Sequence, residues 1–197
     1  MTPDAALLRV LYNPVGWADP AWLTHFNLGR DFPPRLGNTL LLARANVQAI
    51  TSSELELPCV PWLVAHWAVI APAVYLVGAR LARNALVNAN ALPHLRYGAD
   101  RFVTLPLTES LWRQAWCQNG AVSGWRGDMH ARVWAAGLCC LNGAWRNLPP
   151  GWLDRLRLRL PPEVQADVDG ISRVLPASGS CVRLFDQAIT FHHAQNH

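Results

Sequence analysis

The sequence contains no lysine, so all 17 basic residues are arginine. Charged residues make up only 15% of the chain, whereas 51% of the residues are hydrophobic. This composition excludes a disordered tail, and 197 residues are enough for one sizeable hydrophobic core. We therefore expect a single domain over residues 1–197, with a Pro- and Trp-rich segment (1–35) packed on the core and a C-terminal tail (163–197).

Cysteine is also sparse, with five residues and no C-x-x-C spacing, which excludes a disulfide-dense mini-protein. The first residues lack the basic stretch of a secretory signal peptide, so we expect a reducing cytoplasm. Cys139 and Cys140 adjoin in an apolar stretch. Two interpretations stay open: they are small buried thiols, or they are a reactive pair that works with a histidine.

The familiar catalytic motifs are missing, including the glycine-rich nucleotide loops, H-E-x-x-H and G-x-S-x-G. His192, His193 and His197 cluster near the C-terminus, where side chains lack the outer hydrogen bonds that hold metal ligands. We expect no enzymatic activity, no metal and no cofactor. The alternative is a small thiol- or metal-dependent helical enzyme.

Residues 57–79 carry no charge, and this run is long enough to span a bilayer. Three prolines and a histidine interrupt it, and a helical apolar pattern continues beyond its charged end: the interrupting residues are Pro58, Pro61, His66 and Pro72. We expect two buried helices that meet at Pro72, and no transmembrane span.

Apolar residues recur at helical spacing through most of the chain. The predicted helices cover residues 20–23, 37–50, 61–70, 72–89, 108–118, 129–145, 153–160 and 182–191. Asp19 and Asp128 are placed to cap two of them. A line of small residues that begins at Gly78 should let a neighbouring helix approach closely. The sequence thus predicts an all-α fold, a single compact irregular multi-helix domain.

Arginine and tryptophan point to a binding surface. Residues 80–160 hold eleven arginines against four acidic residues, and the chain has ten tryptophans. Arg155, Arg157 and Arg159 lie close to Trp152, a mixture that suits a protein partner or nucleic acid. Helix-turn-helix, zinc and RNP patterns are missing, so we favour a protein partner and keep an Arg-rich nucleic-acid-associated protein as an alternative.

Three segments resemble the SctK/OrgA/YscK family, the adaptor of the cytoplasmic sorting platform in bacterial type III secretion systems. They are residues 12–14 with 19–23, residues 74–81 with 91–93, and residues 148–162. Asp19 stands where the family's opening is expected to have a histidine. We add Trp17, Asp19 and Trp22 to the candidate partner-binding residues.

The resemblance implies a non-enzymatic, mostly helical protein at the cytoplasmic face of the inner membrane. Such an adaptor links the cytoplasmic domain of the inner-membrane ring protein to the pod, or C-ring-like, protein. It is peripheral to the membrane, binds no nucleic acid and supports substrate recruitment and secretion.

Overall fold

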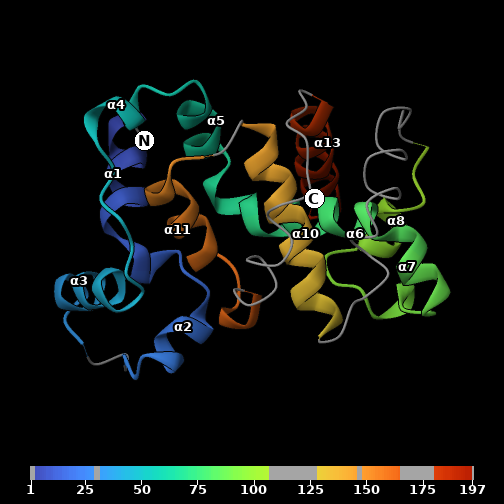
Figure 1. Ribbon diagram of the computed structural model, residues 1–197, viewed down its shortest axis with the longest axis horizontal. Helices are drawn as coiled ribbons and strands as arrows, with labels where there is room; N and C mark the ends of the chain where they lie inside the picture. The colour runs from blue at the N-terminus through green and yellow to red at the C-terminus, as the bar shows by residue number, and fades with distance from the viewer. Residues whose placement is uncertain (1–2, 29–31, 107–127, 146–147, 165–179, 197) are drawn as a thin grey trace. The chain divides into compact units, whose positions relative to one another are not determined.

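A computed structural model describes residues 3–28, 32–106, 128–145, 148–164 and 180–196 (Figure 1). Every regular element in these ranges is a helix, which confirms the predicted all-α class. The helix expected over residues 108–118, with Trp112 and Trp116, lies outside the described residues.

The chain forms two compact units, each built from two separated stretches of sequence. Unit 1 comprises Met1–Ile70 and Leu148–Pro162, and unit 2 comprises Ala71–Asn147 and Glu163–His197. The expectation of one domain over residues 1–197 stays a prediction.

Unit 1 combines short N-terminal helices with one helix from the later part of the chain. Its helices are α1 (Pro3–Tyr12), η1 (Pro14–Gly16), α2 (Pro20–His25), α3 (Pro34–Arg44), α4 (Ser52–Leu55), α5 (Cys59–Ala65), η2 (Trp67–Val69) and α11 (Pro150–Leu158). The Asp19 N–H donates to the Leu158 carbonyl at 2.8 Å, which joins the N-terminal stretch to the end of α11. In Figure 1, α11 lies among the N-terminal helices, and its Trp152 is fully buried in the core.

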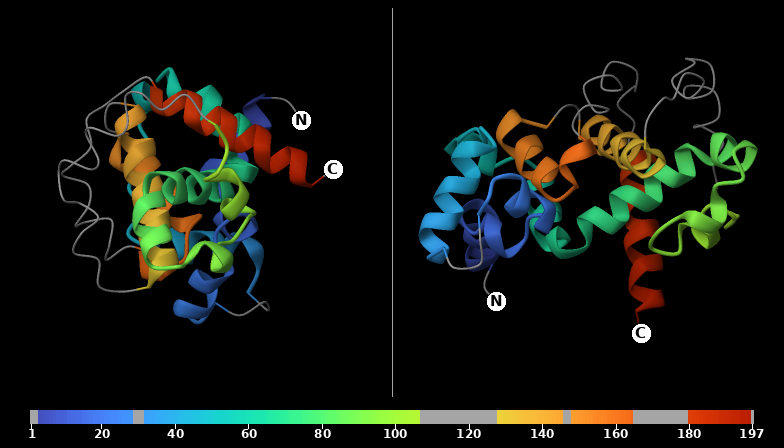
Figure 2. Two further views of the ribbon diagram at one scale, coloured as in Figure 1. Left: turned by 90° about the vertical axis from the view of Figure 1, so that its right-hand side faces the viewer. Right: turned by 90° about the horizontal axis from the view of Figure 1, so that it is seen from below.

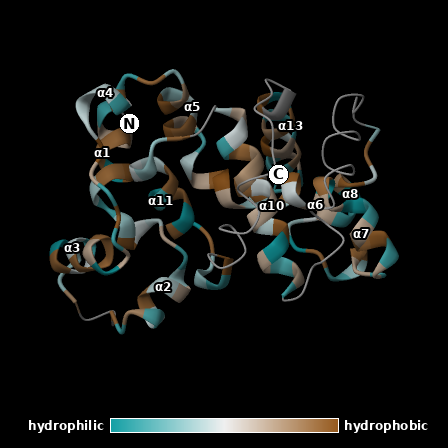
Figure 3. Cartoon of the chain, in the orientation of Figure 1, coloured by the Kyte–Doolittle hydropathy of each residue, from teal (hydrophilic) through white to brown (hydrophobic). Residues whose placement is uncertain are grey.

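Unit 2 is organised around long apolar helices. Its helices are α6 (Ile70–Leu81, whose first residue belongs to unit 1), α7 (Arg83–Asn88), η3 (Leu92–His94), α8 (Ala99–Phe102), α10 (Met129–Ala144), η4 (Pro162–Val164, whose first residue belongs to unit 1) and α13 (Ser180–Gln195). Helix α10 packs against α13, and both can be followed in Figure 2. Most residues of α10 are buried, in keeping with the apolar colouring along it in Figure 3.

Helices α6 and α10 cross at two glycines. A Cβ placed on Gly78 would lie 1.8 Å from the Val133 carbonyl oxygen, and a Cβ on Gly137 would lie 1.9 Å from the Val74 carbonyl oxygen. Only glycine leaves room for backbones this close. The close approach predicted from the small residue at position 78 is confirmed.

The ends of several helices differ from the predicted ones. The break in the apolar run falls at His66–Val69, and Pro72 is the third residue of α6, so the prediction of a junction at Pro72 is wrong. Proline is tolerated there because the first N–H groups of a helix have no partner within the helix. The predicted helix over residues 72–89 is divided at Ala82 into α6 and α7.

Among the described residues, no single helix has both the length and the hydropathy to cross a membrane. The bent pair Cys59–Ala65 and Trp67–Leu81 meets those criteria only when taken together.

Candidate partner-binding site

The seven residues predicted to bind a partner all lie in unit 1. Four of them are buried, with exposed fractions of 0% for Trp152, 5% for Trp22 and Arg155, and 7% for Trp17. Asp19, Arg157 and Arg159 are partly exposed.

Each of the three tryptophans donates a hydrogen bond from its indole N–H to a backbone carbonyl of another segment of unit 1. Trp17 Nε1 donates to the Arg9 carbonyl at 3.1 Å, and Trp22 Nε1 donates to the Leu160 carbonyl at 2.8 Å. Trp152 Nε1 donates to the Glu54 carbonyl at 3.3 Å. Each indole therefore fills the core with its ring and ties a peptide group with its N–H.

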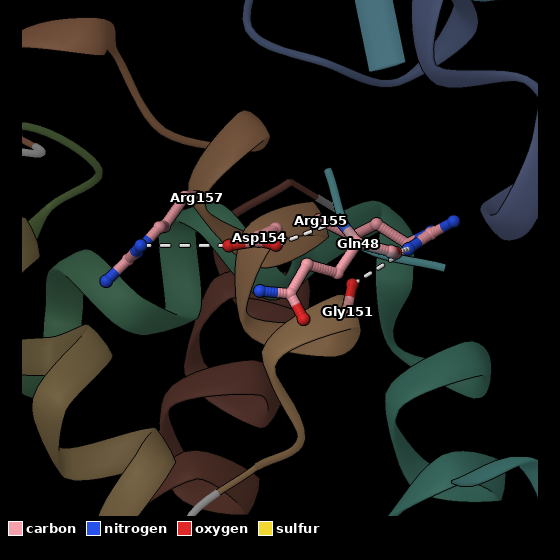
Figure 4. Close-up of polar contacts among 5 residues, drawn as sticks. All are labelled: Gln48, Gly151, Asp154, Arg155 and Arg157. Carbon is pink, nitrogen blue, oxygen red and sulfur yellow. Dashed lines mark hydrogen bonds and ion pairs between the residues drawn. The ribbon is translucent and has the colours of Figure 1, made fainter. Parts of the chain in front are cut away.

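Arg155 and its neighbour Asp154 hold the peptide groups of Gln48 (Figure 4). The Gln48 N–H donates to Asp154 Oδ2 at 3.1 Å, and an Arg155 guanidinium N–H donates to the Gln48 carbonyl at 2.9 Å. The same guanidinium nitrogen donates to the Gly151 carbonyl at 2.9 Å. Burial lowers the pKa of Arg155 from its usual value, while Asp154 opposes this shift. Asp154 and Arg155 of α11 thus fix the connection between α3 and α4.

Arg157 and Arg159 follow Arg155 at every second position, and each has an environment that differs from that of Arg155. Arg157 forms an ion pair with Asp154 at 3.7 Å. Arg159 donates to the Trp17 carbonyl and, at 2.8 Å, to the Ala68 carbonyl. Its guanidinium therefore joins the end of α11 to two parts of the N-terminal stretch of unit 1, one at Trp17 and one at Ala68.

Asp19 caps a helix, as its position predicts. Its Oδ1 accepts from the Ala21 N–H at 2.9 Å, and Pro20 occupies the first position of α2. The structure thus gives each predicted residue, Arg157 in its ion pair included, a contact inside unit 1. Their binding of a partner stays a prediction.

Large apolar side chains are exposed elsewhere, and the sequence reasoning missed them as binding candidates. They are Leu8 (55%), Tyr12 (64%), Phe32, Leu36, Val87 and Tyr97. The first four belong to unit 1. For Leu8 and Tyr12, the sequence did offer a signal of an exposed apolar surface. The segment Pro3–Tyr12 has only Asp4 and Arg9 as charged residues, so its apolar residues are not confined to one face.

Unit 2 contains a polar group inside an aromatic cluster. Tyr75 Oη lies 2.6 Å from His130 Nδ1, and the Arg96 guanidinium lies 5.5 Å from the centre of the Trp134 ring. Burial raises the pKa of Tyr75 to about 12. Burial, helped by nearby Arg96, lowers the pKa of His130. A neutral imidazole can accept a hydrogen bond from the Tyr75 hydroxyl at Nδ1, so the pair satisfies a buried phenol.

The candidate residues for thiol or metal chemistry are less suitably placed. Cys139 and Cys140 are buried in α10, with exposed fractions of 5% and 1%. Burial raises the pKa of Cys59, which disfavours its nucleophilic thiolate. Within the described part of the chain, no group of three or more His, Cys, Asp or Glu side chains is positioned to hold a metal ion. His197 lies outside that part.

Residues 7–196 match the family model described as bacterial type III secretion apparatus protein (OrgA_MxiK). The chain belongs to this family. The resemblance found in the sequence is thereby confirmed, and the protein is a component of the type III secretion apparatus. The family is one of apparatus proteins and is not a known enzyme family. No curated protein and no solved structure matches the chain.

Proposed function

We propose that this member of the OrgA_MxiK family is a non-enzymatic adaptor of the cytoplasmic sorting platform. It links the cytoplasmic domain of the inner-membrane ring protein to the pod protein, and so supports recruitment of secreted substrates. The observation that carries the proposal is the family match over residues 7–196. In this proposal the protein works at the cytoplasmic face of the inner membrane through protein contacts.

The fold supports this function in two ways. An adaptor has to present separate surfaces to two partners, and the chain forms two compact units, each with its own buried core. Several arginines and tryptophans of unit 1 donate to backbone carbonyls, as Arg159 and Trp22 do, and these bonds hold the segments of a small unit in fixed positions. Rigid surfaces bind at a lower entropic cost than flexible ones.

The test is affinity purification of the tagged full-length chain from a bacterium that expresses its type III secretion system. We expect both the ring protein and the pod protein in the eluate, and loss of type III secretion when the chain is deleted. Recovery of neither protein, or normal secretion without the chain, would contradict the adaptor function. A strain with the same tag on an unrelated cytoplasmic protein is the control.

A second experiment asks whether the α11 arginines contribute directly. Arg157→Glu alters a partly exposed side chain, whereas Arg155→Glu removes a buried hydrogen-bonding group. If α11 binds a partner, Arg157→Glu weakens one interaction while circular dichroism stays unchanged. Unchanged recovery of both partners would remove Arg157 from the interface.

A further inference from the structure

Helix α1 keeps one apolar face exposed. Val10 and Leu11 are buried on its other side, where α1 packs against α5 and η1. Leu8 and Tyr12 have exposed fractions of 55% and 64%, and Ala5 is exposed on the same face. An apolar helix face is normally buried against another element or another molecule. The charges at the edges of this face indicate which molecule covers it.

Two residues of opposite charge border the exposed face. Asp4 and Arg9 lie about 140° apart around the helix axis, since each residue turns an α-helix by about 100°. Leu8 and Tyr12 lie between them, and both charged side chains are exposed. Within the ranges that the structure describes, neither charged side chain forms an ion pair. The face therefore has one negative and one positive edge, each with an unused charge.

The positions of these residues match the pattern of a parallel two-stranded coiled coil. In the heptad abcdefg, Ala5 and Tyr12 take a positions, and Leu8 takes the d position between them. We call these three residues the α1 seam. Asp4 then takes a g position and Arg9 the following e position, which are the positions that form ion pairs between helices. Two α1 helices side by side in parallel therefore bring each Asp4 to the Arg9 of the other copy.

Only the parallel orientation gives these ion pairs. An antiparallel pair of α1 helices places like edges together, so that Asp4 faces Asp4 and Arg9 faces Arg9. Val10 takes the f position, opposite the α1 seam, and is buried within unit 1. The two chains therefore extend away from a shared seam in opposite directions.

We propose that the α1 seam pairs with the α1 seam of a second copy of this chain, in parallel and in register. Leu8 and Tyr12 pack against their counterparts, and the two symmetric Asp4–Arg9 ion pairs close the edges. Helix α1 has 10 residues and exposed ion pairs stabilise little, so this dimer belongs to the weak, transient class. The inference does not depend on the proposed adaptor function.

The test is sedimentation velocity of the purified full-length chain from micromolar to millimolar concentration. We expect a concentration-dependent equilibrium between monomer and dimer. Leu8→Ser should weaken dimerisation about tenfold or more, because both copies lose a leucine at the centre of the seam. Leu36→Ser is the matched control, since Leu36 is an exposed leucine of unit 1 that lies in α3. Circular dichroism should show unchanged helix content in both variants.

Charge variants test the parallel register. Asp4→Arg alone, or Arg9→Asp alone, places like charges opposite each other and should weaken dimerisation about threefold to tenfold. Asp4→Arg combined with Arg9→Asp exchanges the two edges and should restore most of the dimer. A mixture of the two single variants should dimerise more readily than either variant alone. Added salt should reduce these differences.

Several outcomes would overturn this proposal. They are a chain that stays monomeric at millimolar concentration, a dimer that Leu8→Ser and Leu36→Ser affect equally, and a dimer that the combined charge exchange fails to restore. A monomeric chain whose Leu8→Ser variant loses another protein in the affinity purification would show that this protein covers the seam. Recovery of the ring and pod proteins with the Leu8→Ser variant leaves the adaptor function in place, whatever the dimer does.

Discussion

Gly78 of α6 and Gly137 of α10 each lie against the backbone of the other helix. A Cβ on either residue would come within 2 Å of a carbonyl oxygen, that of Val133 or that of Val74. The two helices supply much of the buried apolar surface of unit 2. The crossing therefore limits which substitutions the unit can accept.

Gly78→Ala should lower the free energy of unfolding by about 2 kcal/mol, because overpacking costs about 1–3 kcal/mol and the opposing atom is rigid backbone. Chemical denaturation followed by circular dichroism measures the change. Gly37→Ala in α3 is the matched control, since its Cβ would meet a side-chain methyl of Val15 at 3.3 Å. That variant should stay within about 0.5 kcal/mol of wild type, because alanine's higher helix propensity offsets a small adjustment. Equal losses in both variants would contradict the account.

Arg155→Met should destabilise the protein by about 2 kcal/mol or more, since it leaves the Gln48 carbonyl without its charged donor. The exposed Arg35, changed to Met, should alter the free energy of unfolding by less than about 0.5 kcal/mol. Urea titration of the two variants beside the wild type checks this difference. If Arg155→Met is as stable as Arg35→Met, the buried guanidinium does not stabilise unit 1.

Asp19→Ala should lower the free energy of unfolding by about 1 kcal/mol, the usual effect of removing an N-cap side chain. Asp19→Asn should retain most of the stability, because an amide oxygen can accept the same bond from the Ala21 N–H. Thermal unfolding of both variants provides the comparison. A stable Asp19→Ala variant that loses a protein partner would instead place Asp19 in an interface.

Acidification should destabilise unit 2 through His130. Its pKa is lowered in the folded state, so the unfolded chain binds the proton more readily. The stability that depends on a neutral His130 is fully present above pH 6.5, the ordinary pKa of histidine in an unfolded chain. It is lost as the pH falls below that value. His192, whose pKa is also lowered, acts in the same direction. Urea unfolding between about pH 7.5 and pH 5.5 should show a slope that His130→Gln reduces. A slope unchanged by that substitution would exclude His130 as the cause.

Local signals in the sequence predicted local structure well. Both capping aspartates accept the expected backbone N–H groups, Asp19 at α2 and Asp128 at α10. The predicted break at Pro72 is wrong because a proline that ends one helix and a proline in the first turn of another give the same sequence pattern. Tertiary contacts decide between these two cases.

The candidate site was harder to predict, for a physical reason. Arginine and tryptophan suit a binding surface and a buried hydrogen bond equally well, and the acceptor of a buried bond is a backbone carbonyl with no sequence signature. Trp22 and its acceptor at Leu160 are 138 positions apart. Periodicity also identifies an apolar helix without saying which face is covered, so the exposure of Leu8 and Tyr12 emerged only from the structure.

The assembly of unit 1 from residues 1–70 and 148–162 has a consequence for biosynthesis. A ribosome makes the N-terminal helices long before Trp152, Arg155 and Arg159 emerge from its exit tunnel. Until then the nascent chain lacks the side chains that occupy its core and bind the Trp17, Gln48 and Ala68 carbonyls. Unit 1 therefore completes its fold late in translation, and a messenger truncated before codon 148 would yield a product that cannot form it.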